Sequence, residues 1–299
     1  MGVPRNEECE RFAKLAAAEI RKKFKIGRNV TPRVGLALGT GLDEAVSLEQ
    51  EERVPFSEVS PIFKSLKPIH GHALEIAFGF IRDGHSLFIP IIALHGRVHM
   101  NAKPWNDQET VLQVRLQTEM LFQLGVRRLI TTCAAGGVTD NVKTSDIALI
   151  DGFFDLLNRL PLFGNEFITT DTAIDLENLE RLSKQAGPEY MKATGHRVHF
   201  GGHAVVPGPQ IEGVRYGKPF FKSIPDILSI GMGSVVADAA IACLYSDEAV
   251  KVLPISFITD GNDEVCTHEG NVAVGKKAAP DFGRFLRAGI LIAATAAGV

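Results

Sequence analysis

Apolar and polar positions follow two patterns along this chain, one typical of helices and one typical of buried strands. Residues 7–25 repeat apolar side chains at helical spacing. The expected stripe consists of Phe12, Leu15, Ala16, Ile20 and Phe24. Short, continuous apolar runs that end in glycine or polar residues predict buried strands instead, the first at Val34–Leu38. The two patterns together predict helices packed on a central sheet.

The rest of the chain continues this alternation. Further strands are predicted at 72–81, 86–94, 126–138, 146–157, 227–233 and 250–260. The first two of these are expected to form a hairpin through the turn at 82–85. Further helices are predicted at 107–124, 174–186, 210–222, 235–246 and 279–297. Alternating strands and helices indicate an α/β fold with a largely buried sheet, and without a linker-like segment we expect one domain over residues 1–299.

Composition and charge exclude several classes of protein. The net charge is −3, with 32 Lys and Arg against 35 Asp and Glu, so neither a basic excess nor a basic run favours nucleic-acid binding. The four cysteines are far apart and form no CxxC pair, which argues against a disulfide framework and a zinc site. A charged N-terminal segment and the absence of an 18-residue apolar run predict a soluble, cytoplasmic protein that does not enter membranes.

Four predicted strands end in glycine-rich or polar segments, at 39–42, 95–101, 133–138 and 259–263. Ligands of α/β proteins collect beyond the carboxyl ends of strands. The four segments are therefore expected to surround one pocket, although strand exits are rich in turn residues in any fold.

Two of these segments contain groups suited to an anion. Successive backbone N–H groups and the Thr40 hydroxyl in "GTGL" form a turn that can bind an anion, or an ordinary turn. The segment matches neither dinucleotide-binding nor P-loop motifs. Arg97 and His99 are two residues apart, so in an extended segment both side chains point the same way and can bind one phosphate. The alternative is a salt-bridged pair at the surface.

Three more polar residues are candidates with open alternatives. His72, with His70, suggests a metal, but no matching cluster of ligands accompanies the pair, and a turn histidine is the simpler interpretation. Glu212 follows a Pro-Gly-Pro turn and either faces a ligand or lies at a helix start, where the helix dipole favours an acid. Asp260 ends a buried strand and either caps the next turn or meets a donor from a ligand.

Taken in order, short motifs along the chain resemble those of the trimeric purine nucleoside phosphorylases, which share a superfamily with the methylthioadenosine phosphorylases. The motifs are GTGL, GHxxxxxFGF, GRVHM, AAGG, GPxxE, GMGS, SFITD and Thr-His-Glu, from Val34 to the C-terminal helix. The resemblance implies a single α/β domain with a mixed, partly barrel-like sheet flanked by helices. It also implies phosphorolysis of purine nucleosides to free purine and ribose 1-phosphate, with inorganic phosphate as co-substrate and no cofactor or metal.

The resemblance also assigns roles to residues. Phosphate is expected at Thr40, Arg97, His99, Ala134 and Ser234. The nucleoside is expected at His72, Glu212, Met232, Asp260 and His268, with Phe167 closing the pocket of a neighbouring subunit in a homotrimer. His99, Glu212 and Asp260 are the expected catalytic residues, with a protonated Asp260 donating a hydrogen bond to N7 of the leaving purine.

Several positions depart from the family pattern. The family commonly has Asn at Cys133, Ser or Thr at Gly233, Tyr at Asn101 and an aromatic residue at Ile211. Glu212 is typical of 6-oxopurine enzymes, whereas an Asp at position 260 is typical of 6-aminopurine and methylthioadenosine enzymes. Three alternatives therefore stay open. They are a methylthioadenosine phosphorylase, which the polar His268 disfavours, a nucleosidase that uses water, and a paralogue that binds purines without turnover.

Overall fold

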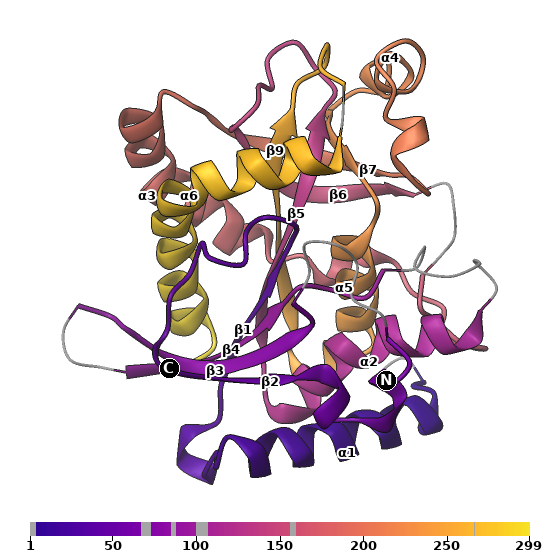
Figure 1. Cartoon of the computed structure of the whole chain (residues 1–299), viewed down its shortest axis with the longest axis vertical. Coiled ribbons are helices and arrows are strands. Elements are labelled where there is room, and N and C mark those ends of the chain that lie inside the picture. Colours follow the sequence, from indigo (N-terminus) through magenta and orange to yellow (C-terminus); the bar gives the residue numbers. More distant parts are fainter. Residues whose placement is uncertain (1–3, 67–72, 85–87, 100–106, 156–159, 266) are drawn as a thin grey trace.

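A computed structural model describes residues 4–66, 73–84, 88–99, 107–155, 160–265 and 267–299 (Figure 1). Its described strands form one mixed sheet in the order β2-β3-β4-β1-β5-β8-β7-β6-β9. An additional pairing of β5 with β9 closes the last five of these strands into a barrel-like ring. The strands are β1 (Val34–Leu38), β2 (Glu49–Pro55), β3 (Glu75–Arg82), β4 (Phe88–His95), β5 (Arg128–Gly137), β6 (Ile147–Asp155), β7 (Val198–Val205), β8 (Ile227–Gly231) and β9 (Lys251–Asp260). The expected α/β fold with a mixed, partly closed sheet is confirmed.

Helices flank this sheet in two groups (Figure 1). In one group α1 packs on α2 and α2 on α5, and in the other α3 packs on α6. The helices are α1 (Glu7–Lys23), α2 (Gln108–Leu124), α3 (Leu176–Thr194), α4 (Gly217–Lys222), α5 (Ser234–Cys243) and α6 (His268–Ala296). α2 and α5 bury side chains on most of their circumference, because α2 lies between α1 and α5, and α5 lies between α2 and strands β5 and β9.

The parallel pairings place the candidate segments together. β4, β1, β5 and β9 are neighbours in that order, and each adjacent pair is parallel. Their carboxyl ends therefore lie at the same edge of the sheet. These strands lead into the four glycine-rich or polar segments, which therefore lie at one edge of the sheet. Three of the four segments contribute residues to one cavity, and the segment at 259–263 contributes none.

Other expectations are corrected by the structure. β2 and β7 were not predicted, since β2 is polar on both faces and β7 contains two adjacent glycines. The helix expected at 210–222 is a short 3-10 turn, Pro209–Ile211, followed by α4. The C-terminal helix begins at His268 rather than 279, because the Thr267 side chain caps it by accepting from the Gly270 N–H. Leu15 is 62% exposed, and Ala13 and Ala17 lie on the buried face of α1 instead.

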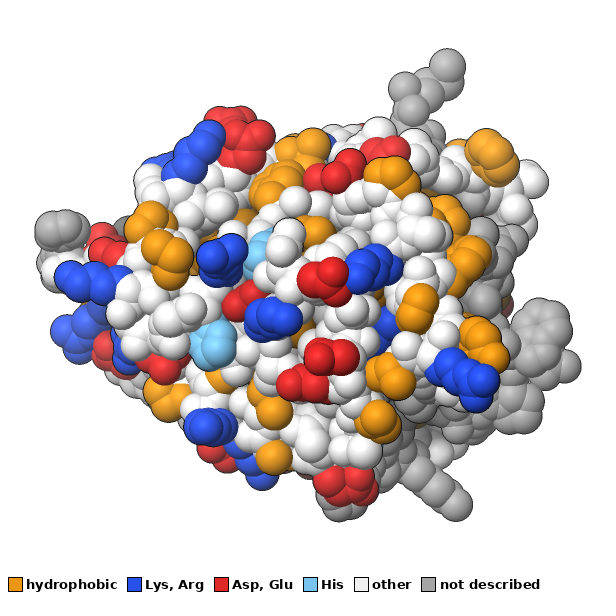
Figure 2. All heavy atoms as spheres, turned by 90° about the horizontal axis from the view of Figure 1, so that it is seen from above, with side chains coloured by type: hydrophobic (Ala, Val, Ile, Leu, Met, Phe, Trp, Pro, Cys, Tyr) orange, Lys and Arg blue, Asp and Glu red, His pale blue; other side chains and the backbone are white. Residues whose placement is uncertain are grey.

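Among the described residues, no helix combines the length and apolarity needed to cross a membrane. Figure 2 looks down on the end of the molecule toward which β5 and β9 point in Figure 1. On the described part of this face, acidic and basic side chains are interspersed with apolar ones, without an extended basic region.

Candidate active site

A cavity of about 180 Å³ lies where the candidate segments converge. Residues from both ends of the chain line it: Gly39, Thr40, His99, Cys133, Ala134, Glu212, Gly231, Met232, Ser234, His268 and Asn271. Seven of the site residues predicted from the sequence are among them, namely Thr40, His99, Ala134, Glu212, Met232, Ser234 and His268. The structure therefore brings most of the predicted phosphate and nucleoside residues to one cavity.

The cavity floor depends on a close approach of β1 and β5. A β-carbon at Gly39 would lie 2.8 Å from both the Cys133 Cα and the Thr132 carbonyl oxygen, so only glycine fits between the strands. The Gly39 N–H donates to the Thr132 hydroxyl at 2.9 Å. Thr40 and Ala134, the residues that follow Gly39 and Cys133, both line the cavity.

The segment after β4 is held by a glutamine of α2. The Gln117 side chain accepts from the Val98 N–H at 2.9 Å and donates to the Val98 carbonyl at 3.0 Å. This pair of bonds fixes the backbone between Arg97 and His99. His99 lines the cavity.

Arg97 occupies a different position from the one expected. Its side chain is fully buried and does not line the cavity. The guanidinium forms an ion pair with Asp238 of α5, with 2.6 Å between Nη2 and Oδ2. Nη2 also donates to the Thr131 hydroxyl, and Nη1 to the carbonyl of Ser234 at 3.4 Å. Neither the expected shared orientation with His99 nor a surface salt bridge describes this arrangement.

Glu212 reaches the cavity from a tight turn between the 3-10 turn and α4. It is 5% exposed and lines the cavity. A β-carbon at Gly217 would lie 1.6 Å from the Ile211 carbonyl oxygen, so this turn requires a glycine there. Glu212 does not lie at the start of a helix, which removes the helix-dipole interpretation.

The backbone at position 233 explains why this chain has a glycine where the family commonly has Ser or Thr. Gly233 has φ +83°, and a β-carbon there would lie 2.7 Å from Val205 Cγ1. A Ser or Thr at 233 would be strained by both effects. Ser234 begins α5 and lines the cavity, so its hydroxyl is available at the position where Gly233 supplies none.

Asp260 is buried and does not line the cavity. The ammonium group of Lys218, on α4, donates to Asp260 Oδ2 at 2.7 Å, and also to the carbonyls of Gly261 and Glu264. Both side chains are 5% exposed or less. Oδ1 of Asp260 accepts from the Thr259 hydroxyl at 3.2 Å, so both carboxylate oxygens are hydrogen-bond acceptors within the protein, and this geometry differs from the expected donation to a purine N7. Sequence reasoning missed Lys218, whose signal is a lone cation within "YGKPFF".

A buried polar chain runs from Cys133 into the barrel. Cys133 Sγ lies 3.4 Å from the Ser256 hydroxyl, Ser256 lies 3.2 Å from that of Ser229, and Ser229 lies 2.8 Å from His203 Nδ1. Burial raises the pKa of the Cys133 thiol to about 11 and lowers the pKa of His203 to about 3. Both groups are therefore neutral near pH 7, and Cys133 presents a thiol rather than a thiolate to the cavity.

The remaining predicted residues lie elsewhere. Phe167 is 95% exposed and lies outside the cavity lining of its own chain. His72 and Asn101 lie outside the described residues. Within the described residues, no three His, Cys, Asp or Glu side chains form a group that could hold a metal.

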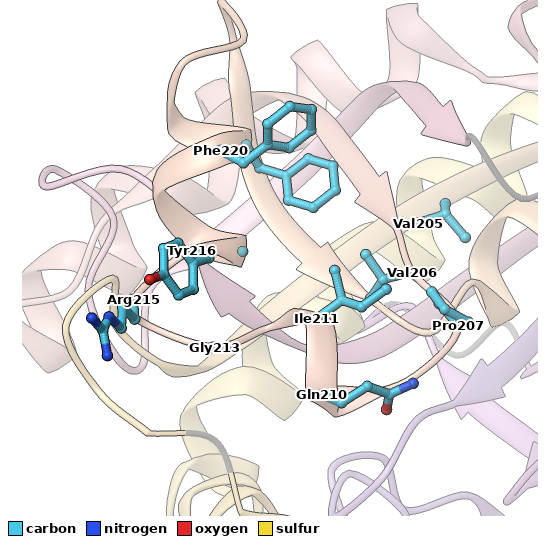
Figure 3. Close-up of a pocket in the computed structure, with 11 residues that line it drawn as sticks. Val205, Val206, Pro207, Gln210, Ile211, Gly213, Arg215, Tyr216 and Phe220 are labelled. Carbon is cyan, nitrogen blue, oxygen red and sulfur yellow. The ribbon is translucent and has the colours of Figure 1, made fainter.

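A second cavity, of about 460 Å³, lies beside the segment that contains Glu212 (Figure 3). Its lining is mostly apolar and includes Val206, Ile211, Tyr216 and Phe220, drawn in Figure 3 around the turn before α4. Ile211, expected near the purine base, lines this second cavity and not the first. The second cavity therefore contains Ile211, whereas Glu212 lines the first.

Comparison with known proteins defines the class to which this fold and cavity belong. The sequence model of the phosphorylase superfamily matches residues 33–290, and the chain belongs to this superfamily. Purine nucleoside phosphorylase 1 of Geobacillus stearothermophilus is 26% identical over 281 residues, which cover 91% of this chain and 94% of that protein. Purine nucleoside phosphorylase 1 of Bacillus subtilis (strain 168) is 24% identical and covers 86% and 91%.

Solved structures agree with this assignment. Isoform 2 of purine nucleoside phosphorylase from Schistosoma mansoni, in complex with cytosine and ribose-1-phosphate, matches with a TM-score of 0.74 at 25% identity. The match covers 95% of this chain and 96% of that one. The resemblance to purine nucleoside phosphorylases predicted from the motifs is confirmed.

Proposed function

We propose that this protein catalyses phosphorolysis of purine nucleosides to free purine and ribose 1-phosphate. The observation that carries the proposal is the cavity in which Thr40, His99, Glu212 and His268 meet, together with Ala134, Met232 and Ser234. Its donors suit a phosphate and its glutamate suits a purine. Relatives named purine nucleoside phosphorylase cover nearly the whole chain, which supports the same activity.

In the proposed reaction, the glycosidic bond breaks while phosphate is bound below the ribose. The ribose gains oxocarbenium character, which the phosphate anion stabilises before it attacks C1′. The Thr40 and Ser234 hydroxyls and the His99 ring would hold the phosphate, and Arg97 would add charge from below. No covalent intermediate on the protein is required, which agrees with the neutral thiol of Cys133.

Glu212 would recognise the purine by accepting a hydrogen bond from N1–H of a 6-oxopurine. Asp260 lies outside the cavity lining and accepts a hydrogen bond from Lys218, so Glu212 is the residue that would recognise the base. Met232 would pack on the ribose, and His268 at the start of α6 would contact the 5′-hydroxyl.

One assay separates the proposal from its alternatives. The protein is incubated with inosine, guanosine, adenosine and methylthioadenosine, with and without phosphate, and free base is measured. Release of base that requires phosphate supports phosphorolysis, and preference for methylthioadenosine identifies the related enzyme. Release without phosphate indicates a nucleosidase. Thermal stabilisation by purines without release indicates a paralogue that binds but does not turn over.

The phosphate assignment is tested by replacing Arg97. We expect Arg97→Ala to lower kcat/KM for phosphate by about 10²–10³-fold, the usual effect of removing one preorganised donor. Arg127→Ala is the control, because Arg127 pairs with Glu248 outside the cavity. Equal phosphate dependence in wild type, Arg97→Ala and the control would show that Arg97 takes no part in phosphate binding.

A further inference from the structure

Arg97 and Asp238 form a buried ion pair, and both oxygens of the Asp238 carboxylate accept hydrogen bonds. Asp238 Oδ1 accepts from the Thr118 hydroxyl at 2.5 Å, and Oδ2 accepts from both the Thr131 hydroxyl and Arg97 Nη2. The Thr131 hydroxyl bridges the two charged groups, since it accepts from Arg97 and donates to Asp238. The carboxylate and the guanidinium are each 1% exposed or less.

Arg97 of this pair contacts the backbone that forms the wall of the candidate phosphate site. Arg97 Nη2 also donates to the Ala37 carbonyl of β1 at 3.5 Å, two residues before the cavity begins at Gly39. Arg97 Nη1 donates to the carbonyl of Ser234, which lines the cavity. The guanidinium therefore reaches the underside of the cavity wall, with one edge against the carboxylate and one edge toward Ser234.

A guanidinium binds carboxylate and phosphate through the same planar set of N–H donors, so the two anions compete for one arginine. Asp238 offers Arg97 a carboxylate at 2.6 Å, inside the protein and at no cost in binding entropy. We propose that Asp238 is a positioning residue that sets the phosphate affinity of this chain by competing with phosphate for Arg97. The proposal rests on the proposed function of the cavity as a phosphate site.

Asp238→Asn tests the competition, because it removes the charge and keeps the size of the side chain. The Arg97 guanidinium then lacks this counter-ion, so an anion in the cavity gains its attraction. We expect inorganic phosphate to bind on the order of tenfold more tightly to Asp238→Asn than to wild type. The measurements are the phosphate-dependent rise in melting temperature, against chloride at equal ionic strength, and the phosphate KM beside kcat.

Two further variants keep the test decisive if Asp238→Asn folds poorly. Thr131→Val keeps both charges and removes the hydroxyl that bridges them, so phosphate affinity should rise in the same direction by a smaller factor. Thr118→Val is the matched control, because it removes a hydrogen bond from the carboxylate oxygen that Arg97 does not contact. It should lower stability and leave the phosphate response unchanged.

The outcomes separate this inference from the proposed function. Tighter phosphate binding and a lower phosphate KM in Asp238→Asn support competition. Weaker binding with a raised KM would show that Asp238 orients Arg97 for phosphate, and would overturn it. Phosphate binding that is equal in wild type and both variants would also overturn it, while leaving phosphorolysis to be judged by base release. Failure of base release with intact phosphate competition would refute the proposed function alone.

Discussion

At the scale of single residues, His203 shows how burial beneath the cavity controls charge. Its side chain is fully buried, and its Nδ1 lies 2.8 Å from the Ser229 hydroxyl. Burial lowers its pKa from 6.5 to about 3, so the folded protein holds a neutral ring where the unfolded chain takes up a proton below about pH 6.5. The stability that His203 contributes is therefore present above pH 6.5 and is lost as the pH falls toward 3.

His203→Gln should reduce this acid sensitivity. As the pH falls from 6.5 toward 3, each pH unit lowers the unfolding free energy of the wild type by about 1.4 kcal/mol through His203 alone. Between pH 6.5 and pH 5 we therefore expect the wild type to lose about 2 kcal/mol more unfolding free energy than the variant. Urea denaturation at both pH values measures the difference. His95, whose pKa burial lowers to about 4, is present in both proteins and cancels. Parallel pH profiles would contradict the buried, neutral state of His203.

At the scale of elements, a buried ion pair joins α4 to the end of β9. Lys218 is fully buried, and its ammonium group is shared by Asp260 and two carbonyls of the following loop. Through this lysine, the segment that carries Glu212 is tied to the strand exit that carries Asp260.

Lys218→Met should therefore be strongly destabilising. It leaves Asp260 buried without its cation, at a cost of about 3–5 kcal/mol. Chemical denaturation measures this loss, and the double variant Lys218→Met/Asp260→Leu should recover much of it. The control is Lys222→Met on the same helix, which removes an exposed pair with Asp140 and should change stability little. A similar effect of both single variants would argue against a structural role for the buried pair.

Some strands could be predicted from the sequence, whereas others and the buried ion pairs could not. β1, β4, β5 and β9 were predicted because each is a continuous apolar run with a marked exit, and the exits of β1, β4 and β5 contribute lining residues to the cavity. β2 gives no such signal, because neither of its faces is buried and its pairing with β3 comes from tertiary structure. Lys218 and Asp238 each stand alone among apolar residues, which suggests burial. Their partners are 42 and 141 residues away, and no local pattern reveals such pairings.

At the scale of the whole molecule, Phe167 and the turn before α4 leave large apolar side chains in solvent. Phe167 is 95% exposed, Tyr216 72% and Phe220 53%. Exposed apolar groups of this size are typical of surfaces that meet another protein. We propose that these surfaces meet in the homotrimer that the family resemblance implies, with Phe167 closing the cavity of the next subunit.

Subunit mixing tests this arrangement. Phe167→Ser and Glu212→Gln should each have low activity alone, since one lacks the closing side chain and the other the purine contact. A head-to-tail ring pairs each cavity with its neighbour's Phe167, so random mixing of the two variants should restore about a quarter of the sites. Nucleoside phosphorolysis by the mixture, beside a mass of three times 32.4 kDa in light scattering, is the expected result. Phe167→Ser should leave the fold of the subunit intact, because its ring is exposed within its own chain. A trimer without recovered activity would show that Phe167 serves no neighbouring cavity, and a monomer with full activity would show that one chain forms the site by itself.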